Sequence, residues 1–109
     1  MSDNLEINIA KDFSSRLGAR YKYEGKFSGE LFLESLLEPK FLDAFNKKVK
    51  LLVYLDGVLG YPSSFVSGSF GKLSDKHGYD KVLSVIDLIS DNQIRREKIL
   101  FEIKFPRKK

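Results

Sequence analysis

The chain has 109 residues, no cysteine and a formal net charge of +4. Its length fits one domain with a single core, and 42% apolar and 31% charged residues are typical of a soluble globular protein. The lack of cysteine excludes disulfides, thiolate zinc sites and cysteine nucleophiles. No apolar run approaches the roughly 20 residues of a membrane span, and no signal peptide is evident. We therefore expect a cytoplasmic protein without membrane contact, one domain over residues 1–109, with its core at about 5–105 and a basic tail at 106–109.

The first half of the chain predicts two strands and a long helix. Residues 5–9 alternate apolar and polar side chains, which favours a half-buried strand, and residues 20–23 alternate again as an edge strand. Ser28 can cap a helix whose apolar stripe recurs at spacings of three to five residues. The stripe consists of Phe32, Leu36, Leu37, Phe41 and Phe45. Pro39 lacks an N–H donor, so we expect a kink there or two abutting helices.

The second half predicts two more strands and two more helices. Residues 49–55 are predicted to form the central strand, and the unbroken apolar run at 51–55 indicates that it is buried on both faces. Ser63 or Ser64 caps a helix that runs to about Lys76, and Gly78 is its stop signal. A short helical turn and then a strand from about Val85 follow.

A capping box at residues 90–93 predicts that the last helix starts near Asp91, with Ile94, Phe101 and Phe105 on one side. The alternation of residues 101–105 leaves a strand open as the alternative. The order β-β-α-β-α-β-α predicts an α/β domain. Its four-stranded, mainly parallel sheet would be flanked by about three helices.

The stretch from Asp56 to Phe65 joins the central strand to the next helix, where open α/β sheets place their functional residues. We expect it to contact a partner protein through Asp56, Gly57, Tyr61, Pro62, Ser63, Ser64 and Phe65. A phosphate on Ser63 or Ser64 would lie on free N–H groups at a helix start. It would add roughly −1.5 to −2 charge and oppose docking of an acidic or apolar partner.

Catalytic and cofactor motifs are weak in this sequence, and we expect no cofactor. The glycines at 68 and 71 are too close for a phosphate-binding loop, and Leu73 stands where a Mg²⁺-binding hydroxyl is needed. His77 is the single histidine, without a G-x-S-x-G elbow or a metal-ligand cluster. One alternative is a phosphoryl acceptor or metal-assisted enzyme that uses Asp56 with help from Asp87.

Another alternative is nucleic-acid binding through the basic tail and three nearby lysines, Lys47, Lys48 and Lys50. The basic tail lacks the interleaved aromatic residues and clustered arginines that nucleic-acid surfaces usually show, so this class is less favoured.

Two blocks of the sequence are similar to a known family. One runs from Gly18-Ala19-Arg20-Tyr21 through Gly25-Lys26-Phe27-Ser28-Gly29-Glu30-Leu31-Phe32. The other runs from Asp56-Gly57 through Ser63-Ser64-Phe65 to Phe70-Gly71-Lys72-Leu73. They resemble the STAS-like branch of the STAS domain superfamily, which also includes bacterial anti-sigma-factor antagonists.

The resemblance implies a four-stranded sheet flanked by helices and a non-catalytic role through protein contact. In the antagonists, a partner kinase with the histidine-kinase-like ATPase fold phosphorylates a serine at the start of the second core helix. Ser63 matches that serine and Ser64 is its neighbour. Pro62 stands where the antagonists have Asp, and Phe65 where they have Gly. The resemblance therefore implies a regulatory module with a serine switch and an ATPase partner.

Overall fold

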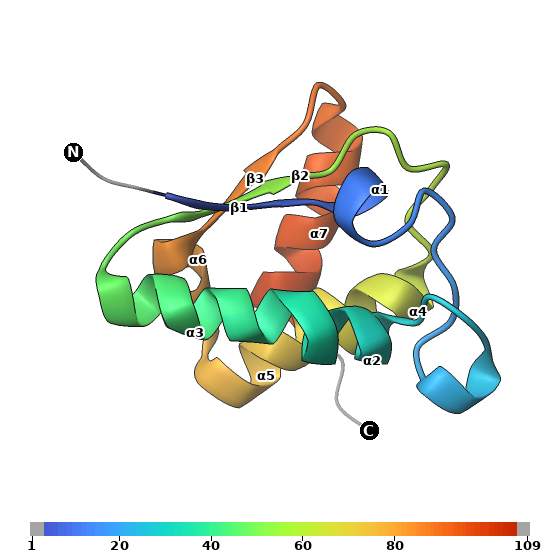
Figure 1. The fold of residues 1–109 in the computed structure, drawn as a ribbon, viewed down its shortest axis with the longest axis horizontal. Helices are drawn as coiled ribbons and strands as arrows, with labels where there is room; N and C mark the ends of the chain where they lie inside the picture. Colours follow the sequence, from blue (N-terminus) through green and yellow to red (C-terminus); the bar gives the residue numbers. More distant parts are fainter. Residues whose placement is uncertain (1–3, 107–109) are drawn as a thin grey trace.

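Three parallel strands form the centre of the computed structural model, which describes residues 4–106 (Figure 1). The strands are β1 (Leu5–Asn8), β2 (Leu51–Tyr54) and β3 (Ile86–Ile89), in the spatial order β1-β2-β3. Leu51 pairs with Leu5 on one side and with Ile86 on the other. The predicted α/β class, parallel pairing and central position of β2 are confirmed, but the described residues contain three strands instead of four.

The expected strand at residues 20–23 is wrong. The short 3₁₀ helix η1 (Lys22–Glu24) occupies this part of the chain. The carbonyls of Ala19 and Arg20 accept hydrogen bonds from Gly29 and Glu30, at 2.8 and 2.9 Å, so this backbone binds a helix start instead of β1. The alternation that suggested a strand comes from a surface pair of stacked tyrosines, Tyr21 and Tyr23, whose ring centroids lie 5.5 Å apart.

Helices cover one face of the sheet. Alternate residues Ile7, Leu51, Val53, Ile86 and Leu88 are buried against these helices. The opposite face carries Glu6, Leu52, Tyr54, Asp87 and Ile89, and none of these side chains is fully buried. The prediction that the central strand is buried on both faces is therefore wrong, because the helices of both crossovers pack on the same side.

The first crossover is a continuous helical rod after the short helix α1 (Ile9–Asp12). The rod consists of α2 (Gly29–Phe32), the π turn η2 (Leu33–Leu37) and α3 (Glu38–Lys47). Ser28 caps it as predicted, because its hydroxyl accepts a 3.0 Å bond from the Leu31 N–H. Pro39 neither ends the rod nor separates two helices. It follows directly on the π turn, where the Glu38 N–H bonds to the Leu33 carbonyl five residues back.

The second crossover has the predicted order of helix, stop, helix and strand. It consists of α4 (Ser63–Val66), the π turn η3 (Ser67–Gly71), α5 (Lys72–His77) and α6 (Tyr79–Val85). Gly78 separates α5 from α6 with a φ of 89°, a left-handed conformation that glycine adopts without strain.

The last element is α7 (Gln93–Lys104), so residues 101–104 are helical. Asn92 caps this helix through a 3.0 Å bond from the Arg95 N–H, and the predicted capping box at residues 90–93 is therefore wrong. Ile94, Phe101 and Phe105 lie on one side of this helix as predicted, but that side is exposed, and Ile99 and Ile103 are buried instead. More helices pack around the sheet in residues 4–106 than the three expected, and no helix there has the length and apolar character needed to cross a bilayer.

Side chains protect both edges of the sheet. Lys40 Nζ donates a 2.9 Å bond to the Glu6 carbonyl on β1, and Arg96 Nε donates a 3.0 Å bond to the Leu88 carbonyl on β3. Unpaired carbonyls and amides on an edge strand can form hydrogen bonds with a strand of another chain. Long basic side chains over the edge discourage this pairing.

Candidate functional site

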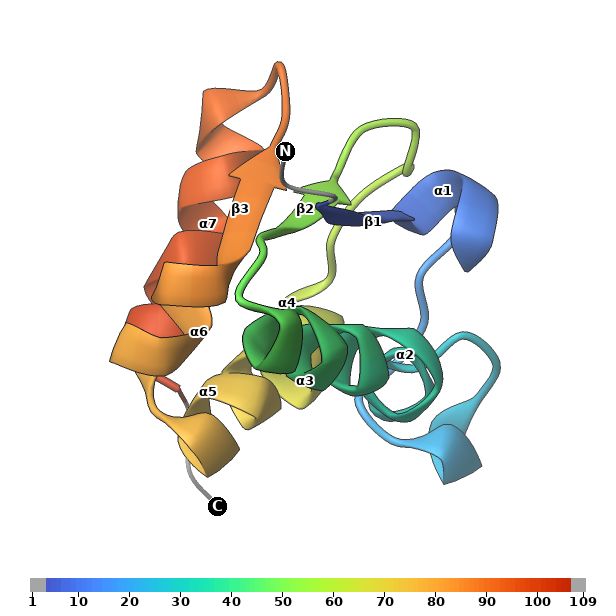
Figure 2. The same cartoon turned by 60° about the vertical axis from the view of Figure 1, so that its left-hand side comes forward.

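The candidate site is the β2–α4 loop, residues 55–62, together with the first turn of α4. It leaves the carboxyl end of β2 and passes over the end of the sheet before it enters α4 (Figures 1 and 2). Asp56 lies at its start. Ser90 Oγ and the Asp91 N–H donate to the two oxygens of this carboxylate, at 2.6 and 2.8 Å. The carboxylate therefore joins the end of β2 to the turn between β3 and α7.

These contacts set the ionisation of Asp56. The hydrogen bond from Ser90, then that from the Asp91 N–H, and more weakly the charge of Arg95, hold the pKa of Asp56 below its usual range. The Arg95 guanidinium lies 3.7 Å from the carboxylate. Asp56 thus acts as an ionised anchor for the loop.

Two basic residues of α7 hold the rest of the loop. Arg95 donates to the Val58 carbonyl at 3.2 Å and lies 5.2 Å from the centroid of the Tyr61 ring, and Lys98 Nζ donates to the Tyr61 carbonyl. The buried hydroxyl of Tyr61 donates to the Leu55 carbonyl at 2.7 Å, and burial raises the pKa of this phenol. The loop is therefore fixed at both ends and in the middle.

The predicted site residues do not all reach the surface. Gly57, Pro62 and Ser63 are exposed, and Asp56 and Ser64 are half-buried. Tyr61 and Phe65 are buried, with Phe65 0% exposed, so their side chains belong to the core instead of a contact surface.

The predicted capping role of the serines is wrong. Pro62 is the N-cap of α4, Ser63 is the first helical residue, and no side chain caps this helix start. Because Pro62 already holds extended backbone angles, Ser63 enters the helix itself, and within residues 4–106 its hydroxyl has no hydrogen-bond partner. The Ser63 hydroxyl is therefore free for other chemistry.

A shallow hollow lies beside the serine. It has a volume of about 500 Å³ and is lined by Arg16, Leu17, Leu59, Gly60, Tyr61 and Pro62. The Leu59 N–H bonds to the Ser15 carbonyl at 2.9 Å, while the Leu59 side chain is 76% exposed. An exposed leucine on an anchored loop, next to a hollow and a free serine, suits contact with another protein.

Sequence reasoning missed Ser90, Arg95, Lys98 and Leu59. Arg95 and Lys98 are three residues apart on one helix face, a spacing that could have signalled a basic contact, but their target on the loop is set by tertiary structure.

The geometry gives little support to chemistry at Asp56. Asp87 is paired with Leu52, four residues before Asp56, which is roughly 13 Å along the strand direction at about 3.3 Å per residue. Within residues 4–106, no three His, Cys, Asp or Glu side chains are grouped to hold a metal ion. The hydrogen bonds of Asp56 are those of an anchor.

His77 takes part in a structural cluster on the far side of the helices. Its Nε2 lies 2.9 Å from Glu38 Oε2, and Lys76 Nζ lies 2.8 Å from the same oxygen, so α5 is tied to α3. Burial by itself raises the pKa of Glu38, but the hydrogen bonds from Lys76 and His77 outweigh it and lower the pKa overall.

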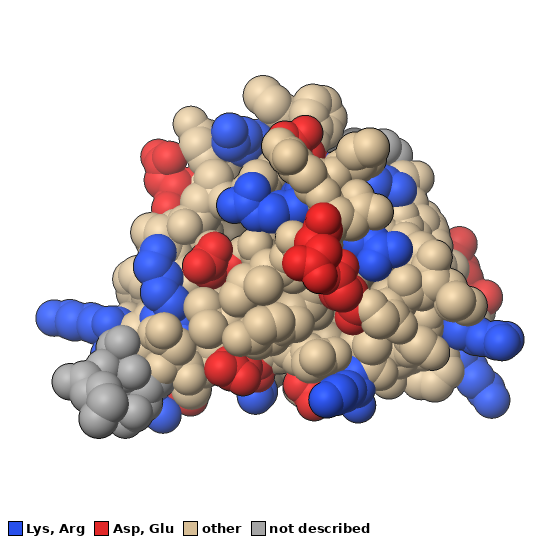
Figure 3. Space-filling view, turned by 90° about the horizontal axis from the view of Figure 1, so that it is seen from above, with Lys and Arg blue, Asp and Glu red and all other residues tan. Residues whose placement is uncertain are grey.

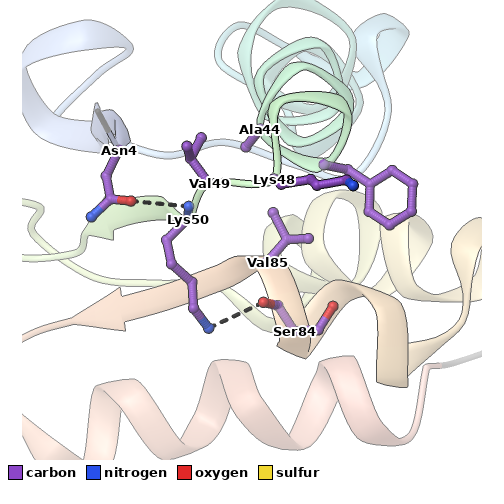
Figure 4. A pocket seen from close by; sticks show the side chains of 8 residues that line it. Asn4, Ala44, Lys48, Val49, Lys50, Ser84 and Val85 are labelled. Carbon is purple, nitrogen blue, oxygen red and sulfur yellow. Dashed lines mark hydrogen bonds between the residues drawn. The ribbon is translucent and has the colours of Figure 1, made fainter. Parts of the chain in front are cut away.

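The lysines considered for nucleic-acid binding are partly engaged. Lys47 pairs with Asp43 at 3.2 Å, and Lys50 Nζ donates to the Ser84 carbonyl at 3.1 Å. Lys48 and Lys50 line a hollow of about 390 Å³ at the amino end of β2 (Figure 4). On the face seen from above, Lys and Arg are interspersed with Asp and Glu (Figure 3). Residues 107–109 of the predicted basic tail lie outside the described residues.

The anchor at Asp56 can be tested by Asp56→Asn. Asparagine offers one acceptor oxygen and no charge, so we expect a lower melting temperature at pH 7. Because the folded-state pKa is depressed, the stabilisation is present above the unfolded pKa of about 3.9 and is lost as the pH falls through the folded pKa. The difference between the variant and the wild type should therefore shrink as the pH falls from about 3.9 through the lower folded-state pKa.

Asp87→Asn is the matched control, because this exposed carboxylate makes no hydrogen bond or ion pair within residues 4–106. Thermal unfolding followed by circular dichroism measures both variants. Equal melting temperatures for the two variants at pH 7 would contradict the anchor.

The sequence model of one family, described as "STAS-like domain of unknown function (DUF4325)", matches residues 28–96. This segment includes β2, the β2–α4 loop, Ser63 and β3. No curated protein and no solved structure matches the chain. The matched segment covers more than half of the sequence, and the chain therefore belongs to the STAS-like domain family of unknown function.

Proposed function

We propose that this protein is a non-catalytic interaction module whose partner contact is controlled by phosphorylation of Ser63. The observation that carries the proposal is the exposed, unbonded Ser63 hydroxyl at the end of an anchored loop, next to an exposed leucine. Membership in the STAS-like family supports a regulatory role, because STAS domains such as the antagonists work through protein contact. The anchors from Asp56, Arg95 and Lys98 hold the contact surface in one conformation before binding, which lowers the entropic cost of docking.

The position of Ser63 suits a phosphate. It is the first residue of a helical rod that continues through residue 77, and the first hydrogen bond of the rod joins the Val66 N–H to the Pro62 carbonyl. The N–H groups of Ser63, Ser64 and Phe65 precede that bond, so they have no partner within the helix. A phosphate there would be stabilised by these donors and by the helix dipole. Ser64 is half-buried, which makes it the less accessible of the two serines.

The partner that we propose is an ATPase with the histidine-kinase-like fold, in line with the resemblance to the antagonists. Its contact surface would consist of Leu59, Pro62, Ser63 and the hollow beside them. Because Leu59 is apolar and the hollow is largely apolar, an added phosphate would oppose docking by placing charge at its rim.

The partner is tested by affinity purification from native cells with mass spectrometry, with the wild type and Leu59→Glu as baits. We expect an ATPase with the wild type and its loss with Leu59→Glu, which leaves the core unchanged because the side chain is 76% exposed. Recovery of the same proteins with both baits, or of no ATPase with either, would count against the proposed contact.

The switch predicts different results for Ser63→Asp and Ser63→Ala. Ser63 is exposed and is not the N-cap, so both substitutions should change the free energy of unfolding by less than about 0.5 kcal/mol. Binding of the recovered partner should weaken with Asp, because of its charge, and should be kept with Ala. Titration calorimetry with the purified partner measures this.

Ser84→Asp is the control, because Ser84 is exposed on α6, at the amino end of the sheet. A carboxylate imitates a phosphate poorly, so the measurement is repeated with protein phosphorylated in vitro. Unchanged affinity after stoichiometric phosphorylation of Ser63 would rule out the switch.

A further inference from the structure

Helix α7 has an apolar outer side that is largely exposed in the part of the chain that the structure describes. Ile94 is 81% exposed, Phe101 61% and Phe105 63%. These residues are separated by seven and four positions, so they lie along one side of the helix, and the two phenylalanine rings touch with centroids 5.1 Å apart. The opposite side of α7 packs Ile99 and Ile103 into the core. Figure 2 shows α7 at the outer edge of the molecule.

The charges around this apolar side are divided between the two ends of the helix. Exposed Asp91 and Glu97 lie toward the amino end, and exposed Lys104 lies at the carboxyl end. Lys98 lies between them, with its ammonium group bound to the Tyr61 carbonyl. The two ends of this surface, acidic at Asp91 and basic at Lys104, complement each other when a second copy is turned end for end.

We propose that α7 pairs antiparallel with α7 of a second copy about a two-fold axis level with residues 99 and 100. In this register Ile94 packs opposite the partner's Phe105, and Phe101 packs against the partner's Phe101 and Ile94. Lys104 then lies within one helical turn of the partner's Asp91, and the reverse pair forms at the other end. The interface is isologous, so it closes as a dimer. Antiparallel helix dipoles add a favourable term.

The small size of the apolar side of α7 sets the expected affinity of the dimer. Three large side chains per copy, on a single helix, bury less than the roughly 800 Å² per partner of a standard interface. We therefore expect a reversible dimer with a dissociation constant on the order of 100 µM. The pairing uses Ile94, Phe101 and Phe105 at α7, whereas the proposed partner contact uses other residues, Leu59, Pro62 and Ser63.

Sedimentation equilibrium of the full chain between about 10 µM and 1 mM tests the pairing. The wild type should shift from monomer to dimer over this range. Phe101→Glu should weaken the dimer by at least about tenfold while circular dichroism stays unchanged, because the side chain is exposed. Leu59→Glu, which adds the same charge at another exposed apolar residue, should dimerise like the wild type. A wild type that is monomeric at 1 mM, or a Leu59→Glu variant as weak as Phe101→Glu, would overturn the proposal and leave this surface to a different protein.

The register is tested by exchanging charges. Asp91→Lys and Lys104→Asp should each weaken the dimer several-fold, because each places like charges opposite one another at both ends. The double variant should regain most of the wild-type affinity, because the exchanged charges again face their opposites. A double variant that is no tighter than either single variant would overturn the antiparallel arrangement.

Discussion

Gly29→Ala is expected to destabilise the protein by about 2–4 kcal/mol. A Cβ atom at this position would lie 2.4 Å from the Phe65 carbonyl oxygen and 3.1 Å from the carbonyl carbon of Gly68. Both are backbone atoms of the second crossover, so the two helical rods would have to move apart. Alanine favours helix by about 1 kcal/mol over glycine, which is too little to offset this clash. Urea unfolding followed by circular dichroism gives the difference in the free energy of unfolding.

Gly60→Ala is the matched control for this substitution. No atom lies within 4 Å of a Cβ built at Gly60, and its φ is outside the left-handed region. We expect a change within about 0.5 kcal/mol, or a slight stabilisation through the unfolded chain. If Gly29→Ala were as stable as Gly60→Ala, the close crossing of the two rods would be wrong.

Phe65→Ala is expected to cost about 3–5 kcal/mol of stability, which is a large part of the 5–15 kcal/mol typical of a small domain. Phe65 is fully buried, and its ring lies 5.7 Å from that of Phe32 and 6.2 Å from that of Phe13. Its removal would leave a cavity between the first and second crossovers. Chemical denaturation measures the loss, and the variant should also show increased proteolysis.

Leu59→Ala is the control, because this side chain is 76% exposed on the same loop region and its loss should change stability by less than about 0.5 kcal/mol. The pair separates the core from the contact surface. A partner-contact role for the Phe65 side chain, as its sequence position suggested, would give the opposite pattern: intact stability and weakened partner binding.

Elements defined by local patterns could be predicted from the sequence. The strands at Leu5–Asn8 and Leu51–Tyr54 have strong apolar periodicity or runs, and Ser28 and Gly78 mark a helix start and a helix stop by their own backbone chemistry. These signals depend on neighbours a few residues away, but local signals of the same kind were misleading at residues 20–23, 63–64 and 90–93.

Features set by distant contacts could not be predicted. Periodicity shows that α7 has an apolar side but does not show which side packs inward. Ile99 and Ile103 are the buried residues because of how α7 packs against the neighbouring helices. The spacing of five residues from Phe32 to Leu37 was a sign of the π turn that an α-helical reading does not use. Tyr21 and Tyr23 alternate with their neighbours as in an edge strand, but in the structure the pattern serves to stack the two rings on each other.

The candidate site was predictable in position but not in mechanism. The strand, loop and helix around Ser63 follow from the sequence, and the structure places Ser63 on the surface at the helix start. The anchors Ser90, Arg95 and Lys98 lie more than 25 residues from the β2–α4 loop in the sequence. Their local sequence pattern does not indicate that they bind this loop.

The two π turns, Leu33–Leu37 and Ser67–Gly71, pack against each other in the middle of the two crossover rods. Each contains one residue more than the α-helical turn that it replaces. Deleting one residue from Leu33–Leu37 would rotate the rest of the helix by about 100° and turn Phe41 and Ala44 out of the core. Insertions and deletions are therefore harmful inside these rods and tolerable in the surface segment around η1. In an alignment of this family, a gap within either π turn would indicate a repacked helix and not a trimmed loop.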